Sequence, residues 1–148
     1  MMIGSGLLRC IHELLAPGCT ILELGSGEGT ALLARDYHMV SVEHDPFWVG
    51  KYDSHYIYAP IIDGWYDTIM LQAQLPDTYH LLLLDGPPGY IGRTGFLDHL
   101  DLFDLTIPII VDDVQRQVEK TILHRLEQIT GRPAEMLEDG IKLFGVLA

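Results

Sequence analysis

Residues 21–30 constrain the fold of this chain more than any other stretch, because a buried strand runs there directly into a glycine-rich turn. The stretch reads Ile-Leu-Glu-Leu-Gly-Ser-Gly-Glu-Gly-Thr. Its first aliphatic residues suit a strand that is covered on both faces, as in a parallel sheet. Gly25, Gly27 and Gly29 then allow positive φ angles and a close approach of the backbone to a ligand, and residues 30–35 can form a short helix. We therefore expect an α/β fold with a ligand site at the carboxyl end of this strand.

The spacing of these glycines distinguishes between two classes of nucleotide site. A dinucleotide-binding turn has the pattern G-x-G-x-x-G, but here the glycines alternate with other residues, and an acid, Glu23, lies two positions before the first of them. This E-x-G-x-G-x-G pattern resembles motif I of the class I S-adenosylmethionine-dependent methyltransferases. The resemblance implies that Glu23 helps to hold the ammonium group of S-adenosylmethionine, and that its amino-acid part is surrounded by the backbone of Gly25, Ser26, Gly27 and Gly29. A tight strand–helix turn that binds nothing is the alternative.

Strand and helix patterns alternate along the rest of the chain. Apolar residues at helical spacing predict the helices, and short apolar runs between turn residues predict the strands. The expected order is helix 5–15, strand 21–24, helix 30–35, strand 37–43, strand 54–60, helix 67–75, strand 79–85, helix 96–103, strand 106–111, helix 114–130 and a hairpin of residues 134–137 and 141–147. The fully apolar strand at 79–85 is expected at the centre of the sheet.

An acid, Glu43, ends the expected second strand, about 20 residues after the first glycine of the turn. At such a position a carboxylate can accept hydrogen bonds from both ribose hydroxyls of an adenosine group. The resemblance supports this role, since class I methyltransferases usually carry an acid there. His44 and Asp45 are adjacent alternatives, and Asp45 is also expected to cap a helix that starts at Pro46.

The contacts with adenine are less well defined by the sequence. Many methyltransferases have an acid just after the third strand, whereas the nearest acid here is Asp63. Trp65 and Tyr66 follow it, and they either flank the adenine, line the acceptor side or pack in the core.

The expected fourth strand ends in the loop Asp85-Gly-Pro-Pro-Gly, which continues to Arg93. The loop lies at the position of the family's motif IV. Its D-G-P-P-G form with a following Arg resembles small bacterial methyltransferases, some linked to sugar modification, and plant glucuronoxylan methyltransferases. The resemblance implies that Asp85 lies beside the transferred methyl group, as a cofactor and catalytic residue. Arg93 either pairs with a phosphate or carboxylate of the acceptor or is a surface residue.

Asp112 and Asp113 follow the next strand, and with Asp85 they form a set of carboxylates that suits Mg²⁺ or Ca²⁺. The set is similar to that of the catechol-type O-methyltransferases, in which an Asp after strand four and an Asp-Asn pair after strand five bind the metal; Asp113 replaces the Asn. The alternative is that Asp112 caps the following helix and Asp113 faces solvent. Without a metal, the base would be Asp85 or a nearby histidine, His44 or His55.

Length and composition restrict the remaining choices. The 148 residues, 48% hydrophobic and 20% charged, fit a single domain over 1–148. The formal net charge of −12 would repel nucleic acid and anionic membranes, and no apolar run has the pattern of a membrane span or signal peptide. Cys10 and Cys19 have neither zinc-type spacing nor the number needed for a disulfide framework. We therefore expect a cytoplasmic protein with a small-molecule partner.

The resemblance covers nearly the whole chain and implies a Rossmann-like methyltransferase fold. This fold is a three-layer αβα sandwich with a mostly parallel seven-stranded sheet that ends in an antiparallel hairpin. We expect methyl transfer from S-adenosylmethionine, with Mg²⁺ as an optional second ligand, to an oxygen of a small molecule such as a sugar or glycan precursor. The acceptor site would be shaped by the chain's own loops or by a second subunit of a homodimer. A non-catalytic methyltransferase-like scaffold protein and an NAD-dependent oxidoreductase are the alternatives.

Overall fold

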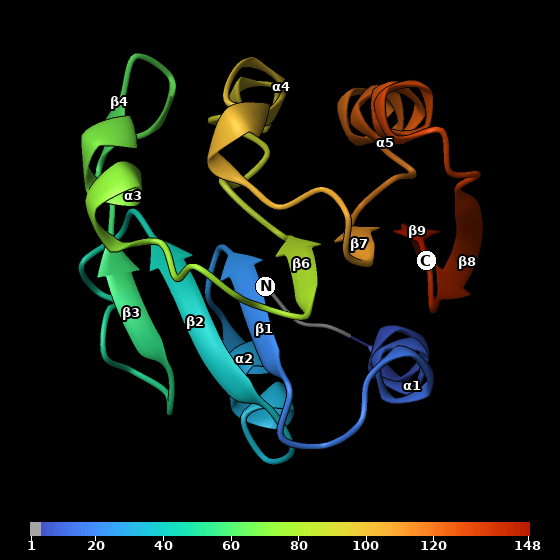
Figure 1. Ribbon diagram of the computed structural model, residues 1–148, viewed down its shortest axis with the longest axis horizontal. Coiled ribbons are helices and arrows are strands. Elements are labelled where there is room, and N and C mark those ends of the chain that lie inside the picture. The colour runs from blue at the N-terminus through green and yellow to red at the C-terminus, as the bar shows by residue number, and fades with distance from the viewer. Residues whose placement is uncertain (1–3) are drawn as a thin grey trace.

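The computed structural model describes residues 4–148, and at its centre lies a seven-stranded sheet in the order β3-β2-β1-β6-β7-β9-β8 (Figure 1). Its strands are β1 (Thr20–Leu24), β2 (His38–Glu43), β3 (His55–Tyr58), β6 (Leu81–Leu84), β7 (Ile109–Val111), β8 (Glu135–Asp139) and β9 (Lys142–Leu147). Strands β1, β2, β3, β6 and β7 are parallel, whereas β9 is antiparallel to both of its neighbours. The predicted mostly parallel sheet with a terminal antiparallel hairpin is confirmed.

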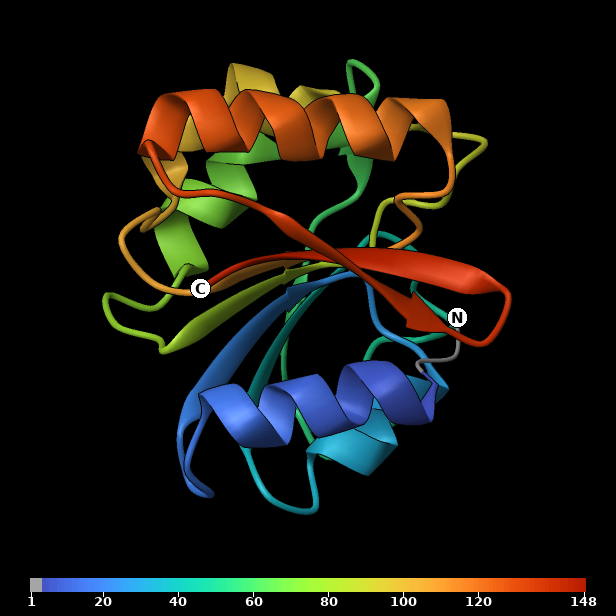
Figure 2. The same cartoon turned by 90° about the vertical axis from the view of Figure 1, so that its right-hand side faces the viewer.

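Helices cover both faces of the sheet and complete the predicted three layers (Figure 2). The helices are α1 (Ser5–Leu14), α2 (Glu28–Leu33), α3 (Thr68–Gln74), α4 (Gly95–Asp98) and α5 (Gln117–Thr130). The first two lie on one face and the other three on the opposite face. Because strand side chains alternate between the faces, Ile21 joins the buried cluster of Ile11 in α1, whereas Leu22 joins that of Leu123 in α5. In residues 4–148 no helix is both long enough and apolar enough to cross a membrane.

The carboxyl ends of the parallel strands form an edge that the helices leave open. In a parallel sheet of this kind, ligands bind outside the carboxyl ends of the strands, where the loops meet. The loops after β1, β2, β6 and β7 reach this edge together, because β1 is paired with both β2 and β6, and β6 with β7.

The helix predicted over residues 96–103 is wrong, because it is broken at His99. The segment forms the four-residue α4 and then a 3₁₀ turn, η1 (Leu100–Leu102). His99 Nδ1 lies 2.8 Å from the carbonyl oxygen of Gly95, which an α-helix would bond to the His99 N–H. The imidazole also stacks on the indole of Trp65, with ring centroids 5.1 Å apart. This tertiary contact favours the break over a continuous helix.

A short antiparallel pair, β4 (Ile61–Ile62) and β5 (Trp65–Tyr66), precedes α3 and is absent from the predicted order. Its turn is Asp63-Gly64, and both residues have positive φ, 53° and 82°. This is the geometry that Asp-Gly favours in two-residue hairpin turns, so the dipeptide was an available signal. The helix expected from Pro46 is also wrong, since residues 46–50 form turns; Asp45 accepts instead from the N–H of Phe47.

Asp139, at the end of β8, joins the terminal hairpin to the start of α1. Its carboxylate accepts hydrogen bonds from the N–H of Gly4 at 2.8 Å and from that of Gly6 at 2.9 Å. A carboxylate at this position also interacts favourably with the positive end of the helix dipole. The amino end of α1 is therefore held by a residue of β8, the strand at one edge of the sheet.

We predict that Gly145 and Leu123 are energetically coupled, because a Cβ at Gly145 in β9 would overlap the Leu123 side chain of α5. Gly145→Ala should destabilise by about 1–3 kcal/mol through overpacking, and Leu123→Ala by about 2–5 kcal/mol through the cavity it creates. The double variant should lose less than the sum, because the shortened side chain makes room for the new methyl group. Urea unfolding of the four proteins measures this, and strictly additive losses would contradict the packing.

Candidate functional site

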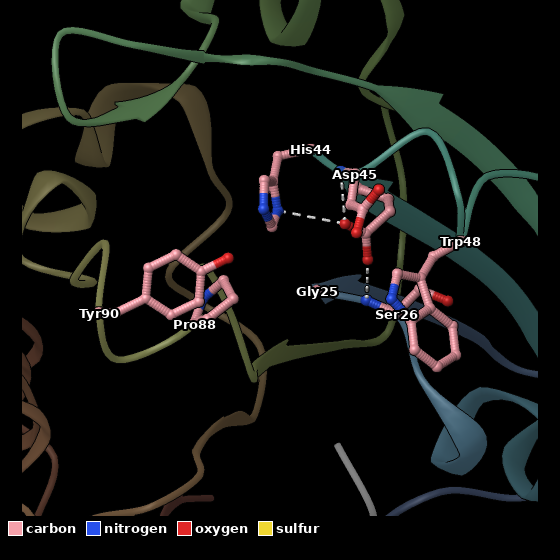
Figure 3. A pocket seen from close by; sticks show the side chains of 8 residues that line it. Gly25, Ser26, His44, Asp45, Trp48, Pro88 and Tyr90 are labelled. Atoms are coloured by element: carbon pink, nitrogen blue, oxygen red, sulfur yellow. Dashed lines mark hydrogen bonds and ion pairs between the residues drawn. The ribbon is translucent and has the colours of Figure 1, made fainter.

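An open cleft of about 490 Å³ lies at the carboxyl ends of β1, β2 and β6 (Figure 3). Its lining residues come from the glycine turn, from the segment after β2 and from the loop after β6: Gly25, Ser26, Glu43, His44, Asp45, Trp48, Pro88 and Tyr90. The cleft therefore combines the turn and the acid that the sequence marks as cofactor ligands.

The glycine turn after β1 touches the loop after β6. Gly25 has a φ of +93°, and a Cβ there would lie 2.8 Å from the carbonyl oxygen of Asp85 and 3.0 Å from Gly86 Cα. Only glycine satisfies both the left-handed conformation and this approach. Gly27 is the N-cap of α2 with an extended φ of −173°, and Gly29 is buried in its first turn, so the positive φ expected for the whole turn is found at Gly25.

Glu23 lies beneath the cleft rather than among its lining residues. It is buried, and its Oε2 accepts hydrogen bonds of 2.5 Å from the hydroxyls of Thr30 and Ser41. These bonds tie β1 to α2 and to β2. Burial raises the pKa of Glu23 to about 7, although the two hydroxyl bonds act in the opposite direction. A role of Glu23 toward the cofactor ammonium stays a prediction.

Glu43 presents its carboxylate to the cleft from the end of β2. One oxygen, Oε1, accepts the N–H of Ser26 at 3.0 Å, and Oε2 accepts the N–H of Asp45 at 2.9 Å. His44 Nδ1 lies 3.2 Å from Oε2. Each carboxylate oxygen can accept a second donor, so the arrangement can bind a pair of neighbouring hydroxyls without releasing the backbone bonds.

Several residues that the sequence suggested for the adenine side or for base catalysis pack elsewhere. Trp65 and Tyr66 are both buried in the core, while Asp63 is exposed in the β4–β5 turn. The Tyr66 hydroxyl has no hydrogen-bond partner among the described residues, and it lies close to Gly86. His55 begins β3 and is paired with Val40, so it is placed toward the amino end of the sheet and away from the cleft.

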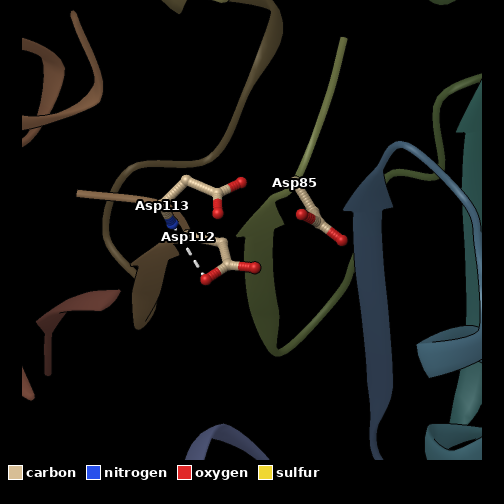
Figure 4. Close-up of side chains that lie close together, drawn as sticks. All are labelled: Asp85, Asp112 and Asp113. Atoms are coloured by element: carbon tan, nitrogen blue, oxygen red, sulfur yellow. Dashed lines mark hydrogen bonds between the residues drawn. The ribbon is translucent and has the colours of Figure 1, made fainter. Parts of the chain in front are cut away.

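Asp85, Asp112 and Asp113 come together beside the cleft, at the ends of β6 and β7 (Figure 4). Each offers a carboxylate oxygen within 4.8 Å of the others, and all three residues are buried. The alternative in which Asp112 caps the long helix and Asp113 faces solvent is wrong. The helix α5 begins at Gln117, with Arg116 at its N-cap position, and Asp113 is held inside at a φ of +60°.

Arg93 is one of the cations that contact this cluster. Its side chain is buried, so the surface alternative is wrong. The guanidinium donates to the carbonyl oxygens of Pro87, Asp112 and Asp85 at 2.9–3.2 Å. It also lies 3.1 Å from Asp113 Oδ2. These donors are directed at protein groups, so Arg93 fixes the ends of two strands in this geometry; its pairing with an acceptor stays a prediction.

Lys142, the first residue of β9, is another cation of the cluster and was missed by the sequence reasoning. Its Nζ lies 3.1 Å from Asp112 Oδ2 and 3.4 Å from Asp113 Oδ1. Although burial lowers its pKa, Asp112 and then Asp113 raise the pKa above the ordinary lysine value. No local motif marks this residue, and only the pairing of β9 with β7 brings it here.

Asp85 differs electrostatically from Asp113. Burial and, next, the Asp112 carboxylate raise the pKa of Asp85 well above its ordinary value, while Arg93 at 3.8 Å opposes this. By contrast, although burial acts against ionisation, Lys142, Arg93 and Arg116 hold the pKa of Asp113 below its ordinary value. Asp85 Oδ1 has no hydrogen-bond partner in the described part of the chain. A buried carboxyl with a raised pKa and an oxygen that accepts no hydrogen bond is suited to proton transfer.

A divalent cation fits this cluster poorly. The donor set is chemically appropriate, because Mg²⁺ and Ca²⁺ prefer carboxylate oxygens. However, Asp112 Oδ2 and both oxygens of Asp113 already lie within 3.4 Å of the Lys142 ammonium or the Arg93 guanidinium. A metal would have to displace or repel these fixed charges.

Comparison with known proteins identifies the fold. No protein-family model and no curated protein sequence matches the chain. Among solved structures, a methyltransferase from Pyrococcus furiosus matches with a TM-score of 0.59 and 15% identity over 95% of this chain and 80% of that one. A methyltransferase-like protein from Silicibacter pomeroyi DSS-3 gives 0.60 and 19% over 99% and 87%. MycE, a methyltransferase of the mycinamycin biosynthetic pathway in complex with Mg and SAH, gives 0.53 and 13% over 86% and 40%. These likenesses confirm the predicted Rossmann-like methyltransferase fold.

We predict that Glu23 makes folding stability fall between pH 4.5 and 7. Its folded pKa of about 7 exceeds the ordinary 4.5, so the native state binds more protons than the unfolded chain in this window, and the free energy of unfolding decreases as the pH rises. Urea unfolding at pH 5 and 7.5 should show that the parent protein loses about 2–3 kcal/mol more than Glu23→Gln over this interval. Parallel pH profiles for the two proteins would contradict the raised pKa.

Proposed function

We propose that this protein is an S-adenosylmethionine-dependent methyltransferase that methylates an oxygen of a small molecule. The proposal rests chiefly on one observation: the Glu43 carboxylate and the Gly25–Ser26 turn line the same cleft of a methyltransferase-type fold. The solved structure of MycE, which has this fold, holds SAH. The acidic net charge of −12 favours a small acceptor over nucleic acid. The loop resemblance at Asp85 favours a sugar or glycan precursor.

The cleft fits the parts of this cofactor. Glu43 would accept the two ribose hydroxyls, since its oxygens keep acceptor capacity beside the bonds from Ser26 and Asp45. Gly25 lines the cleft and packs so closely on the Asp85–Gly86 backbone that no Cβ fits, and the backbone of this turn would approach the amino-acid part. His44, beside Glu43, would lie at the edge of the ribose site.

Bound S-adenosylmethionine would supply the methyl group for an in-line displacement at its sulfonium. The protein's task is to orient the acceptor hydroxyl and to remove its proton. Asp85 is the residue we assign to this proton: in its ionised form, its carboxylate would take the proton from the acceptor oxygen as the new oxygen–carbon bond forms. Arg93 acts as a positioning residue, because it holds the carbonyl oxygens of Asp85 and Asp112 in place.

Calorimetric titration with S-adenosylhomocysteine tests the cofactor assignment, with NADH as the competing ligand. Glu43→Gln should weaken binding by about 10–100-fold, because one carboxylate contributes charge-assisted hydrogen bonds to the ribose. The exposed Glu138→Gln, which makes the same chemical change on β8, is the matched control and should bind normally. Unchanged affinity in a folded Glu43→Gln protein, or selective binding of NADH, would overturn the assignment.

Replacement of Asp85 should increase the stability of the protein and decrease its rate of methyl transfer. We expect Asp85→Asn to raise the free energy of unfolding, increasingly so as the pH rises above 4, because the variant lacks a buried carboxyl that resists ionisation in the folded state. It should retain affinity for S-adenosylhomocysteine and lose about 10²–10⁴-fold in the rate of methyl transfer. Thermal unfolding at several pH values and transfer of labelled methyl groups to a panel of sugars measure the two effects. A variant that is less stable and equally active would contradict both roles.

A further inference from the structure

The carboxylate cluster contains its own positive charge. Asp112 and Asp113 both direct an oxygen at the Lys142 ammonium, at 3.1 Å and 3.4 Å. The ammonium thus bridges two of the three carboxylates that approach within 4.8 Å of one another. Carboxylates at such distances in a buried setting repel one another strongly unless a cation lies among them.

The position of Lys142 is fixed by the architecture of the sheet. The turn of residues 140–141 leads to Lys142 at the first position of β9, and β9 pairs with β7, which ends just before Asp112. The N–H of Val114 bonds to the carbonyl oxygen of Leu143 at 2.9 Å, so the backbone beside the cluster is also tied to this strand. About a quarter of the Lys142 side chain, 27%, is exposed.

The charges of the cluster are balanced without a metal. Arg93 contacts Asp113 at 3.1 Å and Asp85 at 3.8 Å, and Arg116 is 3.7 Å from Asp113. A divalent cation would therefore enter a set of oxygens that already face fixed positive charges. Mg²⁺ in addition requires near-octahedral oxygen ligands at close distances, whereas Asp113 Oδ2 accepts from Arg93 and Asp113 Oδ1 lies 3.4 Å from Lys142 Nζ.

We propose that Lys142 takes the place of a divalent cation in the Asp85–Asp112–Asp113 cluster, so that this protein performs its methyl transfer without a metal. The metal-free transfer rests on the proposed function, whereas the exclusion of a cation from the cluster does not. Lys142 is a positioning residue: it holds the carboxylates of Asp112 and Asp113 in place, and leaves Asp85 as the member of the cluster with an oxygen that accepts no hydrogen bond from the described residues.

Binding of Mn²⁺ alone tests this substitution, with the free-ion electron paramagnetic resonance signal as the readout. The parent protein and Lys142→Arg should leave the signal unchanged. Lys142→Ala should bind Mn²⁺ about tenfold or more tightly than the parent, because removal of the ammonium exposes the carboxylates to a cation. Lys142→Met, which retains an apolar stem, is measured alongside in case the alanine variant unfolds.

Two controls locate the effect. Arg125→Ala removes one positive charge from an exposed position of α5 and should not create a site. Adding Asp112→Asn to the Lys142 variant should abolish the gained binding. Binding of Mn²⁺ by the parent protein that Asp112→Asn removes would overturn the proposal, as would folded Lys142→Ala and Lys142→Met proteins that bind no Mn²⁺. Because this readout needs no cofactor, it stands apart from titration with S-adenosylhomocysteine, whose failure would overturn the proposed function alone.

Discussion

The buried guanidinium of Arg93 is the interaction on which the ligand-binding edge depends. It bonds to carbonyl oxygens on the loop after β6 and on the residue that follows β7, and it pairs with Asp113. One planar group thus satisfies several backbone acceptors that would otherwise be buried without donors. Arg93 fixes the positions of Asp85 and Asp112 relative to each other. These two residues begin the loops after β6 and β7, so the positions of these loops depend on the same contact.

Much of the architecture could be predicted from local patterns. The apolar run of β6 indicated a central strand, and Gly25 and Glu43 were placed at strand ends where ligands bind in such sheets. These predictions succeed because alternation, glycine conformation and strand length are properties of short segments. The broken helix at His99 was not predictable in this way, since the break depends on the imidazole stacking against Trp65, which lies far away in the sequence.

The charged cluster also depends on contacts between distant residues, which local sequence patterns do not predict. The convergence of Asp85, Asp112 and Asp113 followed from the adjacency of two parallel strands, but their environment did not. Lys142 lies 30 residues after Asp112 on a strand whose register is set by the terminal hairpin. Because side chains alternate along a strand, a shift of one residue in β9 would turn this lysine to the other face. Acids placed as in a metal site therefore do not establish metal binding until the positions of the neighbouring lysine and arginine side chains are known.

The contact of Asp139 with Gly4 and Gly6 has a consequence for the order in which the chain matures. Helix α1, which is synthesised before the other described elements, receives these hydrogen bonds from a residue added 135 positions after Gly4. Until the β8–β9 hairpin has left the exit tunnel, the amino end of α1 lacks its carboxylate partner. The same hairpin carries Lys142, so the amino end of α1 and the charged cluster both wait for this hairpin to be made.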